Sequence, residues 1–299
     1  MLWKKTLRGA EQYQQGSMKI PRSTQEMIPV KRILNDGTFV LDSGEYSKMF
    51  AFTDINYTEL RDEEKMRRLV DYSALLNSID KGIYAKISIF FRPIRQEQFE
   101  RDVLIPMNPE DELDDYRENM NTVLREQVRG TLGMTKQAYL TITAGRRNDE
   151  DAAAFFARVD GNLIGSFQAL GVELRAVPLS ERLRLLHDIY RPGLEETFRF
   201  DAHAEKKLGM NWKDSIAPLS AESLNSCTYL KIGGRCCKTL FLNAYPIYLN
   251  DRIVSDVASI GKPMIFTIDF LPIPSAEAMA EAESRSMAID TKIVNYTLH

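Results

Sequence analysis

The sequence has little cysteine and no strong net charge. Its only cysteines are Cys227, Cys236 and Cys237, and the last two are adjacent in the chain. An odd number with an adjacent pair makes a poor disulfide framework and is typical of a reducing compartment. Lysine and arginine total 39 against 42 aspartate and glutamate residues, a net charge of −3, so no broad basic field favours nucleic acid.

Long apolar runs are also lacking. No stretch of about 18 apolar residues occurs, so we expect no membrane-spanning helix. Met1, Leu2 and Trp3 are followed by charged residues rather than by the apolar stretch of a signal peptide. The hydrophobic content of 44% is nevertheless sufficient to build a core. We therefore expect an intracellular protein without a transmembrane span.

No complete catalytic or ligand-binding motif is present. The segment from Gly233 to Thr239 comes closest to a phosphate-binding loop, which requires Gly-x-x-x-x-Gly-Lys-Ser/Thr. Counted back from Lys238, however, the two glycines would fall on Ile232 and Cys237. A hairpin turn at Gly233 and Gly234 explains this segment better. The three histidines have no partner at metal-ligand spacing, and for His187 we favour a structural polar contact. We predict no catalytic, cofactor-binding or metal-binding residue.

What the sequence does contain is an alternation of strand and helix patterns. The order β-α-β-β-α-β is formed by strand 46–53, helix 62–79, strands 85–91 and 138–144, a helix from Asn148 to Gly171, and strand 172–176. This order predicts an α+β fold of the ferredoxin-like, split βαβ type, an antiparallel sheet with helices on one face. An additional helix over 114–129 would be an insertion between the second and third strands. It carries an apolar stripe of Tyr116, Met120, Val123, Leu124 and Val128.

We expect four regions along the chain. Residues 1–27 are predicted to be an extended N-terminal arm. Residues 28–193 would hold a hairpin, turning at Asp36 and Gly37, and the ferredoxin-like subdomain with its inserted helix. Residues 194–225 are predicted to be an irregular connector. Residues 226–299 would form a second, smaller α/β subdomain with strands 227–232, 236–245 and 264–271, a helix over 250–259 and a long final helix over 275–296.

Three groups of polar residues are candidates for function. The acidic cluster of Glu110, Asp111, Glu112, Asp114, Asp115 and Glu118 could attract a divalent cation, but we favour a helix start, where negative charge is stabilised. The other two groups are candidates for docking, and inert leader or turn chemistry is the alternative for them. They are Pro21, Arg22, Ser23 and Gln25 in the arm, and Asp54, Asn56 and Tyr57 after a strand.

Four segments carry a resemblance to a known family. They are residues 21–33, 52–57, 72–80 and 186–191, beginning with Pro21-Arg22-Ser23-Thr24-Gln25 and ending with Leu186-His187-Asp188-Ile189-Tyr190-Arg191. Together they resemble the N-terminal region of the conjugation ATPases of type IV secretion systems, the CagE/TrbE/VirB family, in the variety carried on integrative conjugative elements. The resemblance runs from about residue 20 to the end of the chain.

The resemblance implies an N-terminal α/β region that docks onto channel and inner-membrane components, followed by a RecA-like motor. The chain departs from the family because it lacks the Walker A and B motifs of that motor, so ATP and Mg²⁺ are expected only for the motor. The final helix has no glycine or proline stop signal, which fits a chain that ends before the motor.

We therefore expect a non-catalytic docking and assembly domain at the cytoplasmic face of the bacterial inner membrane. Its partners would be secretion-channel and inner-membrane proteins, its own motor domain and, for a homo-oligomer, further copies of itself. Two alternatives remain open. One is a stand-alone metal-dependent hydrolase with Asp54 as a ligand. The other is a single-stranded nucleic-acid platform on which Tyr139 or Phe90 stacks bases.

Overall fold

The computed structural model describes residues 21–53, 60–80, 82–94, 96–127, 134–201, 211–224, 229–242 and 253–273, and also 276–277, 279–280, 283–284 and 286–287. The chain divides into two compact units. One unit contains residues 1–31 and 179–242, and the other contains residues 32–178 and 243–299.

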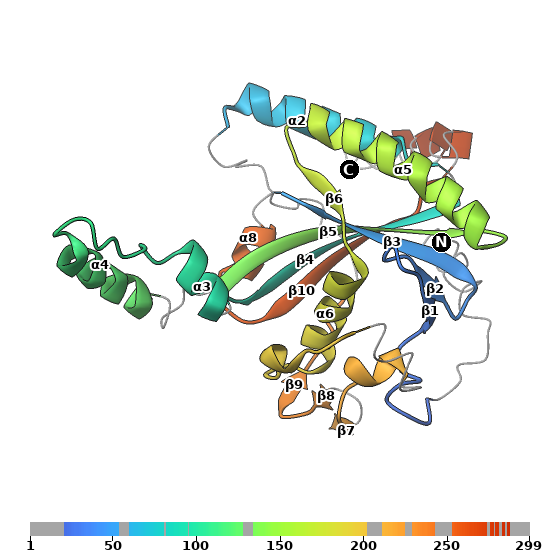
Figure 1. Cartoon of the computed structure of the whole chain (residues 1–299). Helices are drawn as coiled ribbons and strands as arrows, with labels where there is room; N and C mark the ends of the chain where they lie inside the picture. Colours follow the sequence, from blue (N-terminus) through green and yellow to red (C-terminus); the bar gives the residue numbers. More distant parts are fainter. Residues whose placement is uncertain are drawn as a thin grey trace, which may run out of the picture. The chain divides into compact units, whose positions relative to one another are not determined.

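The larger unit is built on an antiparallel sheet with the predicted ferredoxin-like topology. The four strands of this topology are β3 (Glu45–Phe52), β4 (Ile83–Pro93), β5 (Met134–Gly145) and β6 (Leu174–Ala176). They lie in the order β6-β3-β5-β4, and all of these neighbours are antiparallel. The helices α2 (Asp62–Asn77) and α5 (Asp149–Ala169) complete the β-α-β-β-α-β order. Both lie on the same face of the sheet (Figure 1). The predicted α+β, split βαβ fold is confirmed.

The hydrophobic core lies between that sheet face and the two helices. Strand alternation directs Phe50, Leu140 and Ile142 toward the helices, and all three are almost completely buried. Phe156 and Phe167 of α5 pack against them. Each buried side chain of this size contributes about 1.5–3 kcal/mol relative to exposure, so this layer provides much of the unit's stability.

The termini of α5 form as the sequence predicts. Asn148 is the N-cap, and its side chain accepts a hydrogen bond of 2.8 Å from the backbone N–H of Asp151. Gly171 follows the helix with a φ of 73°, a left-handed conformation that favours glycine. A feature that the pattern did not predict is Lys48, which lies buried on β3 and donates to Asp160 of α5 at 2.7 Å.

The predicted hairpin before the sheet is also confirmed. Strands β1 (Val30–Ile33) and β2 (Phe39–Leu41) flank a turn in which Gly37 has a φ of 85°. The carboxylate of Asp36 accepts a 3.0 Å hydrogen bond from the backbone N–H of Thr38. Because β2 pairs antiparallel with β3, the hairpin extends the sheet.

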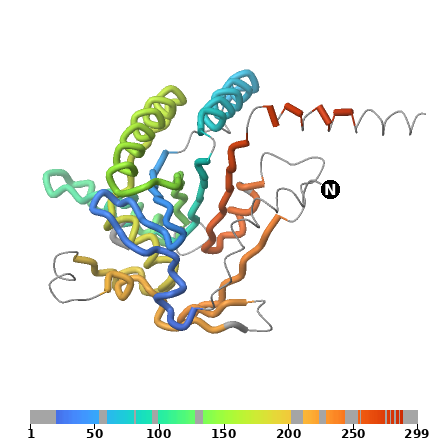
Figure 2. The backbone as a smooth tube through the Cα atoms, turned by 90° about the vertical axis from the view of Figure 1, so that its right-hand side faces the viewer, coloured from blue at the N-terminus to red at the C-terminus, as the bar shows by residue number. Residues whose placement is uncertain are grey.

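The predicted boundary at residue 226 is wrong for the last strand. Strand β10 (Met264–Phe270) pairs antiparallel with β4 of the main sheet (Figure 2). In this pairing Phe270 lies opposite Ala85. The physical reason is that β4 would otherwise be an unpaired edge, and an apolar strand pattern does not specify its partner. Helix α8 (Ile253–Ala258) precedes β10 in the same unit. The described positions 276–277, 279–280, 283–284 and 286–287 are helical, as expected for the final helix.

The smaller unit differs from the prediction in its boundaries. Helix α6 (Leu179–Tyr190) belongs to it rather than to the ferredoxin-like subdomain. The predicted irregular connector contains the 3-10 helices Glu195–Thr197 and Trp212–Ser215, and also β7 (Ala221–Leu224). Strands β8 (Tyr229–Ile232) and β9 (Arg235–Cys237) join β7 in a separate three-stranded sheet. Gly233, with a φ of 57°, makes the turn between β8 and β9, as predicted.

Helix α2 buries only its C-terminal half. Leu75 is buried, whereas Met66, Leu69 and Val70 are each about 60% exposed. The sequence places these apolar residues on one helix face, but the core cluster reaches only the last turns of the helix. Within the part of the chain that the structure describes, no helix is long and apolar enough to cross a membrane.

Candidate docking surface

The insertion between β4 and β5 forms two helices. The predicted helix is α4 (Asp114–Gln127). A shorter helix that the sequence pattern did not predict, α3 (Gln96–Asp102), precedes it. In Figure 1 both helices extend beyond the ends of β4 and β5. The sequence did not predict helix α3 because its single apolar residue, Phe99, gives no helical periodicity.

A loop over residues 103–113 runs back along α4 and is held by polar side chains. Asn121 of α4 is buried, although it is polar. Its side-chain N–H donates to the carbonyl oxygen of Ile105 at 2.9 Å, and its oxygen accepts from the backbone N–H of Ile105 at 2.8 Å. One side chain therefore satisfies both backbone groups of a loop residue 16 positions earlier, as a β-strand neighbour would.

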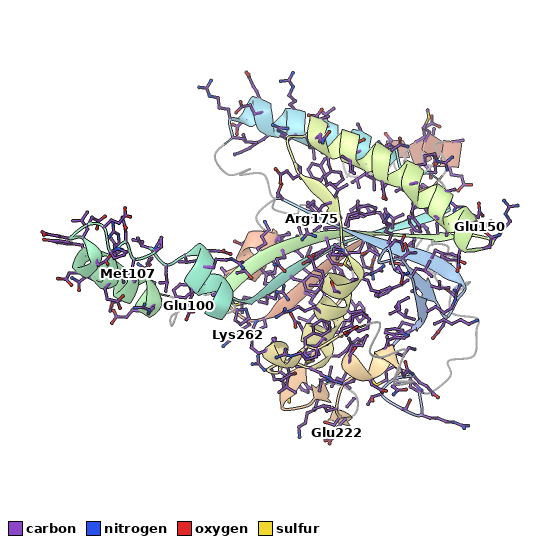
Figure 3. The ribbon with its side chains drawn as sticks, viewed as in Figure 1. Glu100, Met107, Glu150, Arg175, Glu222 and Lys262 are labelled. Atoms are coloured by element: carbon purple, nitrogen blue, oxygen red, sulfur yellow. The ribbon has the colours of Figure 1, made fainter. Side chains whose placement is uncertain are left out.

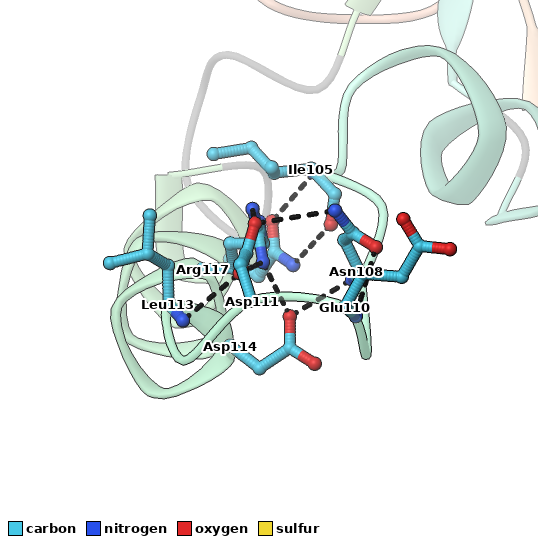
Figure 4. Close-up of polar contacts among 8 residues, drawn as sticks. Ile105, Asn108, Glu110, Asp111, Leu113, Asp114 and Arg117 are labelled. Atoms are coloured by element: carbon cyan, nitrogen blue, oxygen red, sulfur yellow. Dashed lines mark hydrogen bonds and ion pairs between the residues drawn. The ribbon is translucent and has the colours of Figure 1, made fainter.

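A second polar network forms at the start of α4 (Figure 4). The guanidinium of Arg117 donates to both carboxylate oxygens of Asp111, at 2.5 and 2.6 Å, and to Asp114 at 2.7 Å. These hydrogen bonds lower the pKa of Asp111 to about 2, and they raise the pKa of Arg117. The pKa of Asp114 is lowered, mainly by the backbone N–H of Asn108, which donates to it at 3.0 Å. The network therefore ties the loop to the first turn of α4.

The same network bears on the acidic cluster identified in the sequence. Asp111 and Asp114, two of its six carboxylates, already accept hydrogen bonds from Arg117 and from loop backbone groups. Asp114 and Asp115 lie in the first turn of α4, where negative charge favours the helix dipole. In the described ranges, no group of three or more histidine, cysteine, aspartate or glutamate side chains is arranged to hold a metal ion. The geometry therefore favours the helix-start interpretation.

Four apolar residues at α4 lie on one exposed side, whereas Leu124 of the predicted stripe is half-buried and Val128 lies outside the described residues. Leu113 immediately before the helix, and Tyr116, Met120 and Val123 within it, recur at three, four and three positions, so they line one side. We call these four residues the α4 stripe. Their exposed fractions are 52%, 74%, 52% and 47%. In the loop, Val103, Ile105 and Met107 are also exposed, and Figure 3 labels Met107 on this insertion. Clustered exposure of this kind, unlike a single exposed leucine, marks an interaction site.

The α4 stripe has an acidic border. Glu112 directly precedes Leu113, and Glu126 follows Val123 by three positions. Arg125 forms an ion pair with Glu118 at 2.7 Å, and Arg117 forms one with Asp111, so both arginines of the helix are already paired with carboxylates. Among the residues described, the side chains of Glu110, Glu112, Asp115 and Glu126 have no ion-pair partner. The surface thus combines a preformed apolar stripe with uncompensated negative charge.

Only part of the predicted docking arm lies within the described residues, and only part of that is exposed. Pro21, Arg22 and Ser23 are exposed. They belong to a segment of turns rather than to an extended arm, because the backbone N–H of Arg22 donates to Glu26 at 2.8 Å. Gln25 contacts Asp214 and accepts from the side chain of Asn211 at 3.3 Å, so it holds the segment within its own unit. Residues 1–20 lie outside the described residues, as do the candidates Asp54, Asn56 and Tyr57.

Neither predicted stacking residue is accessible. Tyr139 is 2% exposed and Phe90 is 8% exposed, and the two rings pack edge to face with centroids 5.3 Å apart. The hypothesis that these rings stack nucleic-acid bases is therefore wrong.

His187 has polar contacts inside its own unit. Its side chain is completely buried, with Nδ1 3.5 Å from Asp188 and Nε2 3.4 Å from the hydroxyl of Thr197. Burial lowers the pKa of His187.

Comparison with known proteins does not identify a family for this chain. No family model matches the chain, and no curated protein matches it.

Proposed function

We propose that this chain is a docking and assembly region of a conjugation ATPase of a type IV secretion system. Its role would be to hold that ATPase at the cytoplasmic face of the inner membrane by binding secretion-channel and inner-membrane proteins. The four segments of the sequence resemblance support the family, and the α4 stripe supports binding as the activity. The stripe is the single observation on which docking depends most.

The construction of the insertion favours binding over catalysis. A catalytic site needs charged groups that are poised toward a substrate, whereas Arg117, Asp111 and Asp114 neutralise one another. The result of their interaction is a fixed loop and a fixed helix start. A preorganised apolar surface loses less conformational entropy when a partner binds, so such a scaffold strengthens association.

In this proposal the chemistry of ATP and Mg²⁺ belongs to a motor domain outside this chain. The stand-alone hydrolase alternative depends on Asp54, which lies outside the described residues.

The test is a transfer assay with paired substitutions. In cells that depend on the ATPase for conjugation, Met120→Asp places a charge in the α4 stripe and is expected to lower transfer frequency at least tenfold. Gln168→Asp is the control, because Gln168 is exposed on α5 of the same unit and does not belong to a group of exposed apolar residues. Wild-type transfer by Met120→Asp, with the variant protein present at normal levels, would refute the proposal.

A further inference from the structure

We infer that the α4 stripe binds a basic amphipathic helix of another protein, an inference that rests on the proposed docking function for its biological setting. The spacing of three, four and three positions is that of one side of a helix-helix seam, in which apolar side chains interdigitate. From Leu113 to Val123 the seam is about 15 Å long, which matches about three turns of a partner helix.

The charges around the stripe determine the chemistry of that partner. Between residues 103 and 127 there are seven aspartate and glutamate residues but only two arginines. Both arginines are engaged with carboxylates of the same insertion. Lysine or arginine on the edges of a partner helix would pair with Glu112 and Glu126, whereas carboxylates there would be repelled.

The same charges disfavour two other occupants. A second copy that docked through its own α4 stripe would bring a second acidic border against the first, and like charges across an interface are unfavourable. An anionic membrane surface would be repelled in the same way, since helices that lie on such membranes carry lysine and arginine on their polar face. A cationic, apolar-faced helix satisfies both features of the surface.

The binding experiment uses two synthetic helical peptides of about 20 residues. Both carry leucine at the seam positions, and they differ only in having lysine or glutamate at the flanking positions. Because the interface is small, we expect the lysine peptide to bind with a Kd on the order of 10 μM in fluorescence anisotropy, and salt to weaken it. The glutamate peptide is expected to bind at least tenfold more weakly.

Variants of the chain locate the site. Met120→Asp should weaken binding of the lysine peptide at least tenfold, and the control Gln168→Asp should leave binding unchanged. The double substitution Glu112→Lys and Glu126→Lys should invert the preference, so that the glutamate peptide binds more tightly. A gain of binding cannot arise from misfolding, so this variant remains informative if Met120→Asp is unstable.

Several outcomes would overturn the inference. The first two are equal binding of both peptides and loss of binding in Gln168→Asp. The others are binding to vesicles of phosphatidylglycerol that requires Met120, and a concentration-dependent dimer that Met120→Asp abolishes. The peptide result is also separable from the proposed function. If the lysine peptide binds but Met120→Asp leaves conjugative transfer normal, the binding surface is retained and the secretion role is rejected. If Met120→Asp lowers transfer but the lysine peptide does not bind, only the basic partner is rejected.

Discussion

Replacing Asn121 by alanine should release the 103–113 loop without unfolding the protein. The substitution removes two hydrogen bonds to Ile105, each contributing about 0.5–1.5 kcal/mol. Alanine recovers up to about 0.5 kcal/mol through its higher helix propensity, so the local loss is about 0.5–2.5 kcal/mol. Since 1.4 kcal/mol corresponds to a factor of 10, hydrogen exchange of the Ile105 amide should accelerate roughly tenfold.

The assay is hydrogen exchange of residues 103–113, read together with the thermal unfolding midpoint. Asn119→Ala is the matched control, because Asn119 is an exposed asparagine on the same helix and tests helix propensity alone. The reasoning would be refuted if both substitutions accelerated exchange equally. It would also fail if Asn121→Ala lowered the unfolding midpoint as much as a substitution in the core of the sheet.

Two further predictions concern the larger unit. Phe50→Ala removes a completely buried ring and should lower the free energy of unfolding by about 3–5 kcal/mol in urea titration, unlike the exposed control Met66→Ala. Arg32 lowers the pKa of Asp149 to about 2, below the unfolded value of about 3.9. Asp149 therefore stabilises the fold above about pH 4, and this contribution is lost as the pH falls toward 2. Asp149→Asn should flatten the stability profile in that window, whereas Glu150→Gln, an exposed neighbour, should not. An unchanged profile for Asp149→Asn would contradict this.

The parts of the fold that the sequence predicted are those determined locally. Each element of the β-α-β-β-α-β order shows its own periodicity, and Asn148 and Gly171 mark the ends of α5 by cap chemistry. The turn at Gly37 is likewise specified by neighbouring residues. Such signals need no knowledge of distant contacts.

What the sequence did not predict depends on residues far apart in the chain. Strand β10 pairs with β4 across about 180 positions, and strand periodicity contains no information about the partner. Lys48 meets Asp160, 112 positions away, through the packing of α5 on the sheet. The contact of Gln25 with Asp214 is of the same kind.

The candidate site illustrates a different limit. The apolar stripe containing Tyr116, Met120 and Val123 was evident from spacing, but spacing shows only that a helix has an apolar side. Whether that side is buried depends on what packs against it. The arrangement in which Asn121 faces the loop and Tyr116 faces outward became visible only in three dimensions.

The most direct test of docking as the function is site-specific cross-linking from the α4 stripe in cells. A photoreactive p-benzoylphenylalanine is placed at position 116, where the exposed Tyr116 already carries an aromatic ring, and cross-linked products are identified by mass spectrometry. The control carries the same group at the exposed position 168 on α5. We predict that position 116 cross-links to a channel or inner-membrane component of the conjugation machinery, and that position 168 does not. The absence of such a product from position 116, in cells that support transfer, would contradict the account.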